Sequence, residues 1–165
     1  MNVGFFRHGP AVARGTKEVS EADRPLTPEG RKKTLQAAKG LEALDLGIDA
    51  IYTSPLPRAF QTAEIVAGVL RLPAPEVLDG LSPGGSARRL LEGLRNLDAK
   101  TPLLVGHEPL LSAAVSLAVC GGEAGAFEMK KAGLAWVEFD DASARPRGLL
   151  QLLLSGSALR RMTKG

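Results

Sequence analysis

Two arginines and two histidines in this chain are placed so that they could bind and transfer a phosphoryl group. Arg7 and His8 directly follow an apolar run, in the stretch FFRHGP, and His107 follows another, in LLVGHEP. Arg58 lies a few residues beyond a third apolar run, in SPLPRAFQTA. Guanidinium groups are forked donors that match phosphate oxygens, and a neutral imidazole is a good nucleophile near neutral pH. These residue types together point to phosphate as the bound group.

The same side chains argue against a metal site, because arginines repel a cation and no cluster of carboxylates accompanies the histidines. Neighbouring guanidiniums also favour the uncharged form of an imidazole by like-charge repulsion. One histidine could then attack phosphorus while the other donates hydrogen bonds to the equatorial oxygens. Transfer of the phosphoryl group to His8, and then to water, would make the chain a phosphatase.

Alternating strands and helices would bring these residues together. Short apolar runs predict strands at 2–6, 48–53, 102–105, 133–139 and 149–154. Apolar residues at helical spacing predict helices at 27–46, with Leu35, Ala38, Leu41 and Leu44 on one side, at 56–70, from Ser86 through Leu97, and at 109–119. This alternation indicates an α/β fold with a mostly parallel central sheet. The last two strands are joined without a helix, so we expect one antiparallel strand at the sheet edge.

Parallel sheets bind ligands outside the carboxyl ends of their strands. Arg7, His8, Arg58 and His107 all follow predicted strands, so they should meet at one edge of the sheet. Helix starts near Arg58 and Pro109 would add backbone N–H groups that favour an anion.

Composition limits the function classes. The 165 residues suit a single domain, and 44% apolar residues are enough for a core. A formal charge of +3 and 4% aromatic residues, with no basic stripe, give no indication of nucleic-acid binding. No apolar run is long enough to cross a membrane and no signal peptide is evident, so we expect a cytoplasmic protein. The lone Cys120 excludes an internal disulfide, and we expect it to be a small buried side chain.

Three motifs resemble those of the histidine phosphatase superfamily: RHG at 7–9, SPLPRAFQTA at 54–63 and GHEP at 106–109. Two further motifs, RPLTPEG at 24–30 and LSPGG at 81–85, narrow the resemblance to bacterial SixA-type phosphohistidine phosphatases. With the strand pattern, the resemblance covers nearly the whole chain, residues 1–165. It implies a phosphoglycerate mutase-like, three-layer α/β/α fold without metal or organic cofactor. It also implies that His8 is the phosphorylated nucleophile, and that Arg7, Arg58 and His107 complete the phosphate pocket.

The choice of substrate depends on the cover over the pocket and on a proton donor. Only the segment 10–23 could contribute a lid, so we expect an open pocket suited to a phosphohistidine on a partner protein, such as a phosphotransfer domain. Asp79 is a candidate proton donor and Glu108 is an alternative. Because imidazole is a weaker base than an alkoxide, this weak acid supply favours phosphohistidine over esters. A general small-molecule phosphomonoesterase and a non-catalytic phosphate-binding module remain alternatives.

The remaining basic residues of interest are Arg24 and a group near the C-terminus. Arg24 could form a surface salt bridge with Asp23 or Glu21, or reach the rim of the pocket. Arg160, Arg161 and Lys164 suggest a solvated terminus.

Overall fold

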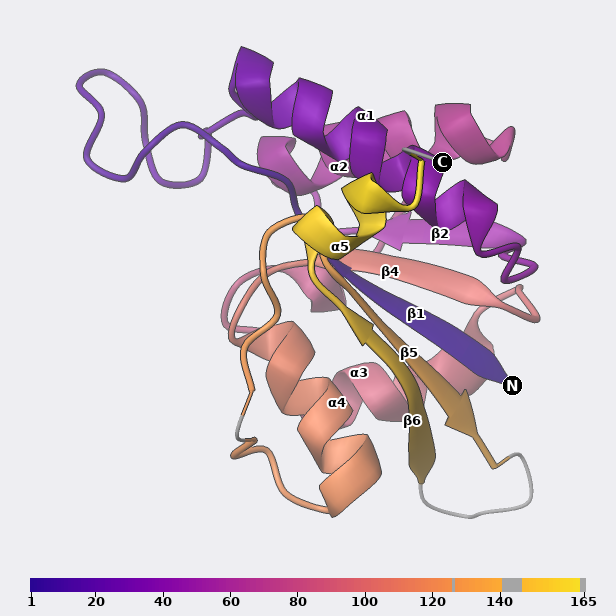
Figure 1. The fold of residues 1–165 in the computed structure, drawn as a ribbon. Helices are drawn as coiled ribbons and strands as arrows, with labels where there is room; N and C mark the ends of the chain where they lie inside the picture. The colour runs from indigo at the N-terminus through magenta and orange to yellow at the C-terminus, as the bar shows by residue number, and fades with distance from the viewer. Residues whose placement is uncertain (126, 141–146, 164–165) are drawn as a thin grey trace.

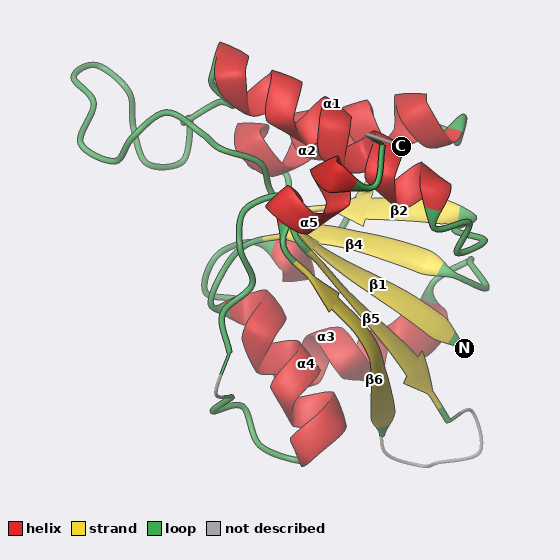
Figure 2. Ribbon diagram, viewed as in Figure 1, coloured by secondary structure: helices red, strands yellow, loops and turns green. Residues whose placement is uncertain are grey.

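A six-stranded sheet lies between two layers of helices (Figures 1 and 2). The structure, a computed structural model, describes residues 1–125, 127–140 and 147–163. One face of the sheet is covered by α1 (Pro28–Ala43), α2 (Pro57–Leu70) and α5 (Gly156–Arg161), and the other by α3 (Ala87–Gly93) and α4 (Leu110–Cys120). The predicted α/β fold is therefore confirmed. Among the described residues, no helix is both long and apolar enough to cross a membrane.

The strands are β1 (Asn2–Arg7), β2 (Ala50–Thr53), β3 (Glu76–Val77), β4 (Pro102–Gly106), β5 (Leu134–Phe139) and β6 (Gly148–Leu154). Their order in the sheet is β3-β2-β4-β1-β5-β6, and the pairs among the first four are parallel. The antiparallel strand is β5, which pairs with both β1 and β6. The predicted antiparallel strand thus exists, but its placement at the edge is wrong. Because β5 pairs directly with β1, the following strand β6 takes the outer position.

The N-termini of the helices follow the capping residues in the sequence. Thr27 accepts a hydrogen bond from the Gly30 N–H, and Pro28 occupies the first turn of α1. Ser86 caps α3 in the same way, as predicted, but α3 ends at Gly93 and a 3-10 turn, Leu94–Asn96, follows.

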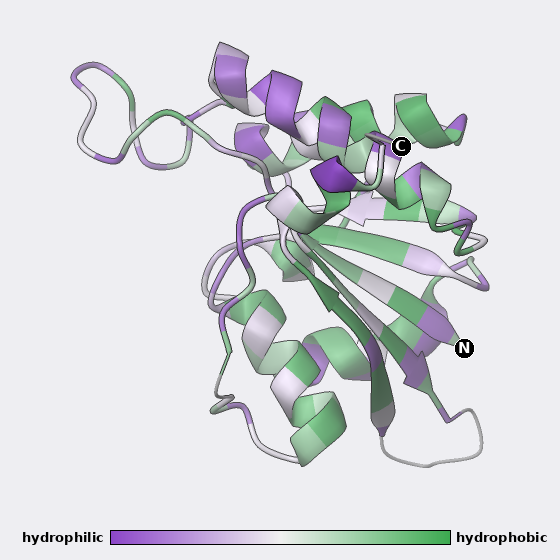
Figure 3. Cartoon of the chain, viewed as in Figure 1, coloured by the Kyte–Doolittle hydropathy of each residue, from purple (hydrophilic) through white to green (hydrophobic). Residues whose placement is uncertain are grey.

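The buried side of α1 differs in part from the predicted one. Ala38 and Leu41 are buried as expected, but Leu35 is 41% exposed. The buried stripe runs instead through Thr34, Ala37, Ala38 and Leu41, and Leu35 lies to one side of it. Figure 3 shows the hydrophilic outer side of α1.

Three elements lie outside the predicted ones. The two-residue strand β3 and the 3-10 turn Asp79–Leu81 lie within a segment interpreted as loop, and α5 forms close to the C-terminus. Arg161 is exposed, as expected for a solvated terminus, Arg160 is partly exposed, and Lys164 lies outside the described residues. α5 packs on α1 at Gly40, where a Cβ atom would stand only 2.0 Å from the Leu159 carbonyl oxygen. Cys120, expected to be buried, is exposed because it is the last residue of α4, before the left-handed Gly121.

Each face of the sheet carries its own hydrophobic core. Phe5 belongs to the core beneath α3 and α4, and Phe6 to the core beneath α1 and α2. Both phenylalanines are fully buried, as is the whole of β4. The strands β1 and β4 therefore form a rigid base for the residues that follow them.

Candidate active site

The ends of β1, β2 and β4 meet at one edge of the sheet and open into a cleft of about 1050 Å³. Arg7 pairs with Gly106, the His8 N–H donates to the Gly106 carbonyl at 3.0 Å, and the Ser54 N–H donates to the Val105 carbonyl at 3.0 Å. These backbone bonds fix the positions of the three strand ends relative to one another. Four side chains predicted for the phosphate pocket, those of Arg7, His8, Arg58 and His107, all line this cleft.

The backbone and the neighbouring side chains hold His8 in one orientation. Its Nδ1 lies 2.7 Å from the Gly9 carbonyl oxygen, which can only accept, so Nδ1 carries the proton and Nε2 is the free base. The Gly9 N–H donates to the Thr62 hydroxyl at 2.9 Å, and that hydroxyl donates to the Arg58 carbonyl at 2.7 Å. A Cβ atom at Gly9 would stand 2.0 Å from the Thr34 hydroxyl oxygen, so only glycine fits this turn.

The electrostatic environment keeps both imidazoles uncharged at neutral pH. Burial lowers the pKa of His8 to about 3, and repulsion from His107, when its ring is protonated, and from Arg58 and Arg7 acts in the same direction, although the bond to Gly9 opposes these effects. Burial, followed by the charges of Arg58, Arg24 and Arg7, lowers the pKa of His107 to about 4. The two ring centroids are 5.2 Å apart. His8 therefore presents the nucleophilic form of its ring inside a cationic cleft.

The two arginines are anchored by carbonyl groups. Arg7 Nη1 donates to the Met129 carbonyl at 2.6 Å and lies 3.1 Å from a carboxylate oxygen of Glu128. Arg58, only 3% exposed, donates from Nη1 to the Glu21 carbonyl at 2.9 Å. The Nε atoms of both arginines are buried and have no hydrogen-bond partner among the described residues. Neither Nε–H is therefore committed to another group of the described chain.

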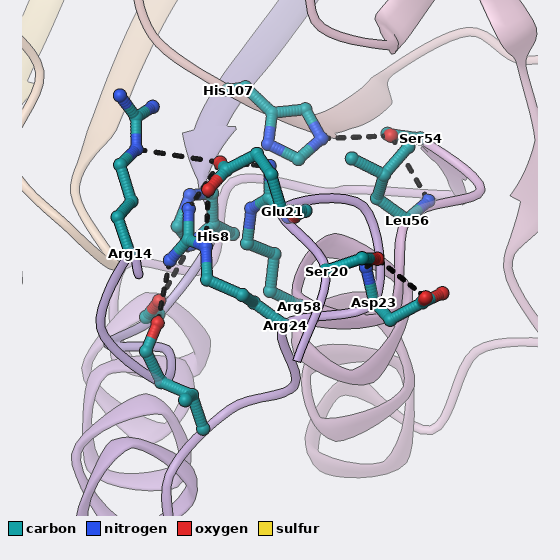
Figure 4. Close-up of polar contacts among 12 residues, drawn as sticks. His8, Arg14, Ser20, Glu21, Asp23, Arg24, Ser54, Leu56, Arg58 and His107 are labelled. Carbon is teal, nitrogen blue, oxygen red and sulfur yellow. Dashed lines mark hydrogen bonds and ion pairs between the residues drawn. The ribbon is translucent and has the colours of Figure 1, made fainter. Parts of the chain in front are cut away.

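Glu21 is a cleft residue that the sequence interpretation named only as a partner for Arg24. Its carboxylate accepts two hydrogen bonds from Arg24, at 2.8 Å from Nε and 2.6 Å from Nη2 (Figure 4). The same carboxylate lies 3.4 Å from Arg14 Nε and 3.6 Å from Arg58 Nη2. The hydrogen bonds from Arg24 are the main cause that lowers the pKa of Glu21. The two alternatives for Arg24 are both realised, because it pairs with Glu21 and also lines the cleft.

The two candidate proton donors, Asp79 and Glu108, differ in their position relative to the cleft. Asp79, a candidate catalytic acid in the sequence, is exposed and does not line the cleft, because Leu81 anchors its turn in the core. Glu108 does line the cleft, but its two oxygens accept hydrogen bonds from the backbone N–H groups of Ser112, at 3.1 Å, and Met129, at 3.4 Å. Glu108 thus joins α4 to the segment that anchors Arg7.

Within residues 1–125, 127–140 and 147–163, no group of three or more His, Cys, Asp or Glu side chains is arranged to hold a metal ion.

Comparison with known proteins gives matches of three kinds. The family described as histidine phosphatase superfamily (branch 1) matches residues 3–82. An uncharacterised protein of Picosynechococcus is 39% identical over 137 residues, which cover 81% of this chain and 82% of that protein. The solved structure of the protein histidine phosphatase SixA complexed with tungstate has a TM-score of 0.82 and 29% identity, covering 96% of this chain and 99% of that one.

A further structural match concerns the fold alone. A putative alpha-ribazole-5'-P phosphatase from Escherichia coli has a TM-score of 0.76 with 16% identity, over 94% of this chain and 97% of that one.

Proposed function

We propose that this chain, which belongs to the histidine phosphatase superfamily, removes phosphoryl groups from phosphorylated histidine side chains of a partner protein. Membership of the superfamily and the phosphatase neighbours make the chain a hydrolase. The substrate class and the roles of the individual residues are the parts that we propose.

One observation carries the mechanism: an uncharged His8 with a free Nε2 stands in a cleft whose lining includes Arg7, Arg58 and a second histidine. In the first step, Nε2 of His8 forms a bond to phosphorus while the bond from phosphorus to the substrate nitrogen breaks. In the second step, a water oxygen attacks the phosphohistidine, the bond to His8 breaks and inorganic phosphate leaves. Arg7, Arg58 and His107 stabilise the charge on the equatorial oxygens in both steps.

The supply of acid supports phosphohistidine as the substrate. An alkoxide leaving group needs a proton donor, whereas an imidazole is a much weaker base. Asp79 lies outside the cleft, and both oxygens of Glu108 accept backbone hydrogen bonds. Glu21 is held as the anion by Arg24. The relative named SixA, a protein histidine phosphatase, is consistent with this choice.

The partner is proposed to be a cytoplasmic protein that carries its phosphohistidine on the surface, such as a phosphotransfer domain. The single cysteine of the chain fits the reducing conditions of that compartment.

The proposal is tested by comparing two substrates with the same enzyme preparation: a histidine-phosphorylated phosphotransfer domain and a sugar phosphate. We expect inorganic phosphate to be released much faster from the protein substrate, and we expect His8→Ala to abolish the release. Full activity of His8→Ala would overturn the mechanism. Binding of the phosphorylated domain without release would instead identify a phosphate-binding module.

A general small-molecule phosphomonoesterase is the second candidate. The observation in its favour is that a carboxylate, Glu108, lies in the cleft beside His107. Comparable turnover of the sugar phosphate and the phosphorylated domain, lost in Glu108→Gln for the sugar phosphate alone, would establish it.

A further inference from the structure

We propose that Ser54 is a positioning residue that fixes the tautomer of His107, so that the Nδ1–H of His107 faces the phosphoryl group. This inference rests on the proposed function for its consequence in catalysis. Its structural part concerns only the free protein and can be tested without a substrate.

The contact between the two residues is short and fully enclosed. Ser54 directly follows β2, is 0% exposed and has its Oγ 2.8 Å from His107 Nε2. His107 is 2% exposed, and its other ring nitrogen, Nδ1, is buried and has no hydrogen-bond partner in the parts of the chain that the structure describes. Figure 4 shows that Nε2 points towards Ser54, while the opposite side of the ring faces His8 and Glu21. The ring is therefore held at Nε2, while the hydrogen-bonding capacity of the buried Nδ1, on the side towards His8 and Glu21, is unused within the described chain.

The hydrogen-bonding capacity of Ser54 determines the direction of this bond. The Leu56 N–H donates to Ser54 Oγ at 3.3 Å and so occupies one of its lone pairs. Within the described part of the chain, the Ser54 hydroxyl contacts no other hydrogen-bond acceptor, so its hydrogen is free to be donated to His107 Nε2. An uncharged imidazole carries a single proton, which must then reside on Nδ1.

The charge of the ring supports this assignment. The pKa of His107 is lowered by burial and by the neighbouring arginines, so the ring is neutral at pH 7 in the free protein. In the opposite tautomer, a nitrogen lone pair would face the anionic phosphoryl oxygens and repel them. With the proton on Nδ1, the ring instead offers these oxygens a donor that is already in place.

The loss of the Ser54 hydroxyl should therefore weaken catalysis through His107. In Ser54→Ala, His107 Nε2 is buried without a donor, so the ring can take the other tautomer or rotate. Loss of a single oxyanion donor lowers kcat by about 100- to 1000-fold. Because the effect of Ser54 passes through a second residue, we expect a smaller fall in kcat, about 10- to 100-fold, with a lesser change in KM.

Nitrogen-15 NMR of the imidazole groups tests the tautomer directly. The chain has only two histidines, so His8→Ala assigns the remaining signals to His107. In the phosphate-free wild type at pH 7 we expect a protonated Nδ1 and an unprotonated Nε2 in His107. In Ser54→Ala we expect a mixture of tautomers or the reversed one. Ser54→Cys keeps the shape but supplies only a weak donor, so it serves if the alanine variant does not fold.

Ser116→Ala is the matched control, because Ser116 is also fully buried but lies on α4, outside the residues that line the cleft. We expect this control to leave the His107 signals and kcat unchanged. A wild-type His107 with its proton on Nε2 would overturn the proposal, as would an unchanged tautomer in both Ser54 variants. If the tautomer is as expected but phosphohistidine protein is not hydrolysed, only the proposed function fails.

Discussion

The two buried histidines should make the stability of the folded protein unusually sensitive to mild acid. Burial lowers the pKa of His8 to about 3 and that of His107 to about 4, whereas both return to about 6.5 in the unfolded chain. As the pH falls below about 6.5, the unfolded chain therefore binds protons that the folded chain does not. The stability that neutral histidines allow is complete above about pH 6.5 and is lost as the pH falls towards 4 and 3.

The size of this loss follows from the proton count. One proton corresponds to about 1.4 kcal/mol per pH unit, and about 1.5 units separate 6.5 from pH 5. Each histidine should thus lower the free energy of unfolding by about 2 kcal/mol between pH 7 and pH 5. In His8→Asn, the difference in stability between these two pH values should shrink by about 2 kcal/mol, and His107→Asn should give a similar change.

Urea unfolding at the two pH values, without phosphate, measures this difference. Phosphate must be absent because an anion that binds the folded state would add its own stabilisation. Each variant is compared with itself at the two pH values, so a change in its stability at pH 7 does not affect the comparison. An unchanged pH dependence in both asparagine variants would refute the claim that the imidazoles are buried in the uncharged form.

Two further predictions concern Glu21 and Gly40. In Glu21→Gln, a negative charge is removed from beside Arg24 and Arg58, so we expect phosphate to bind a few-fold more tightly. Isothermal titration calorimetry checks this. The control is Glu42→Gln, because Glu42 forms an ion pair with the exposed Arg71 away from the cleft, and weaker phosphate binding to Glu21→Gln would contradict the prediction. In Gly40→Val, the new Cβ atom would stand 2.0 Å from the Leu159 carbonyl oxygen, far inside van der Waals contact, so α5 must shift. We expect a loss of about 1–3 kcal/mol in thermal or urea unfolding with nearly normal kcat; wild-type stability would show that α5 does not pack there.

The predicted site residues could be found in the sequence because each depends on a strand end. Arg7 and His107 lie at or just beyond the ends of β1 and β4, which pair in parallel, so their positions follow from the topology. Arg58 is fixed by the first turn of α2, next to β2. Site residues of this kind can be predicted once the order of strands and helices is predicted correctly.

The remaining features depend on packing that local sequence does not determine. Glu21 enters the cleft through the conformation of the segment 11–24, which contains no helix and only a single-bridge pairing, Ala11 with Leu26. Asp79 is turned outwards because Leu81 occupies the core two residues later. In the same way, α5 depends on a close approach to Gly40 that no apolar periodicity indicates. Sequence patterns therefore predicted the cationic base of the cleft but not the conformation of its wall.

The most direct test of the central claim is to trap the phosphorylated enzyme. The protein is mixed with a phosphorylated histidine domain, quenched in alkali and mapped by peptide mass spectrometry, and phosphorus-31 NMR identifies the nitrogen that carries the phosphate. We predict acid-labile phosphate on Nε2 of His8. Phosphate on His107, on a carboxylate, or on no residue while inorganic phosphate is still released would contradict the account.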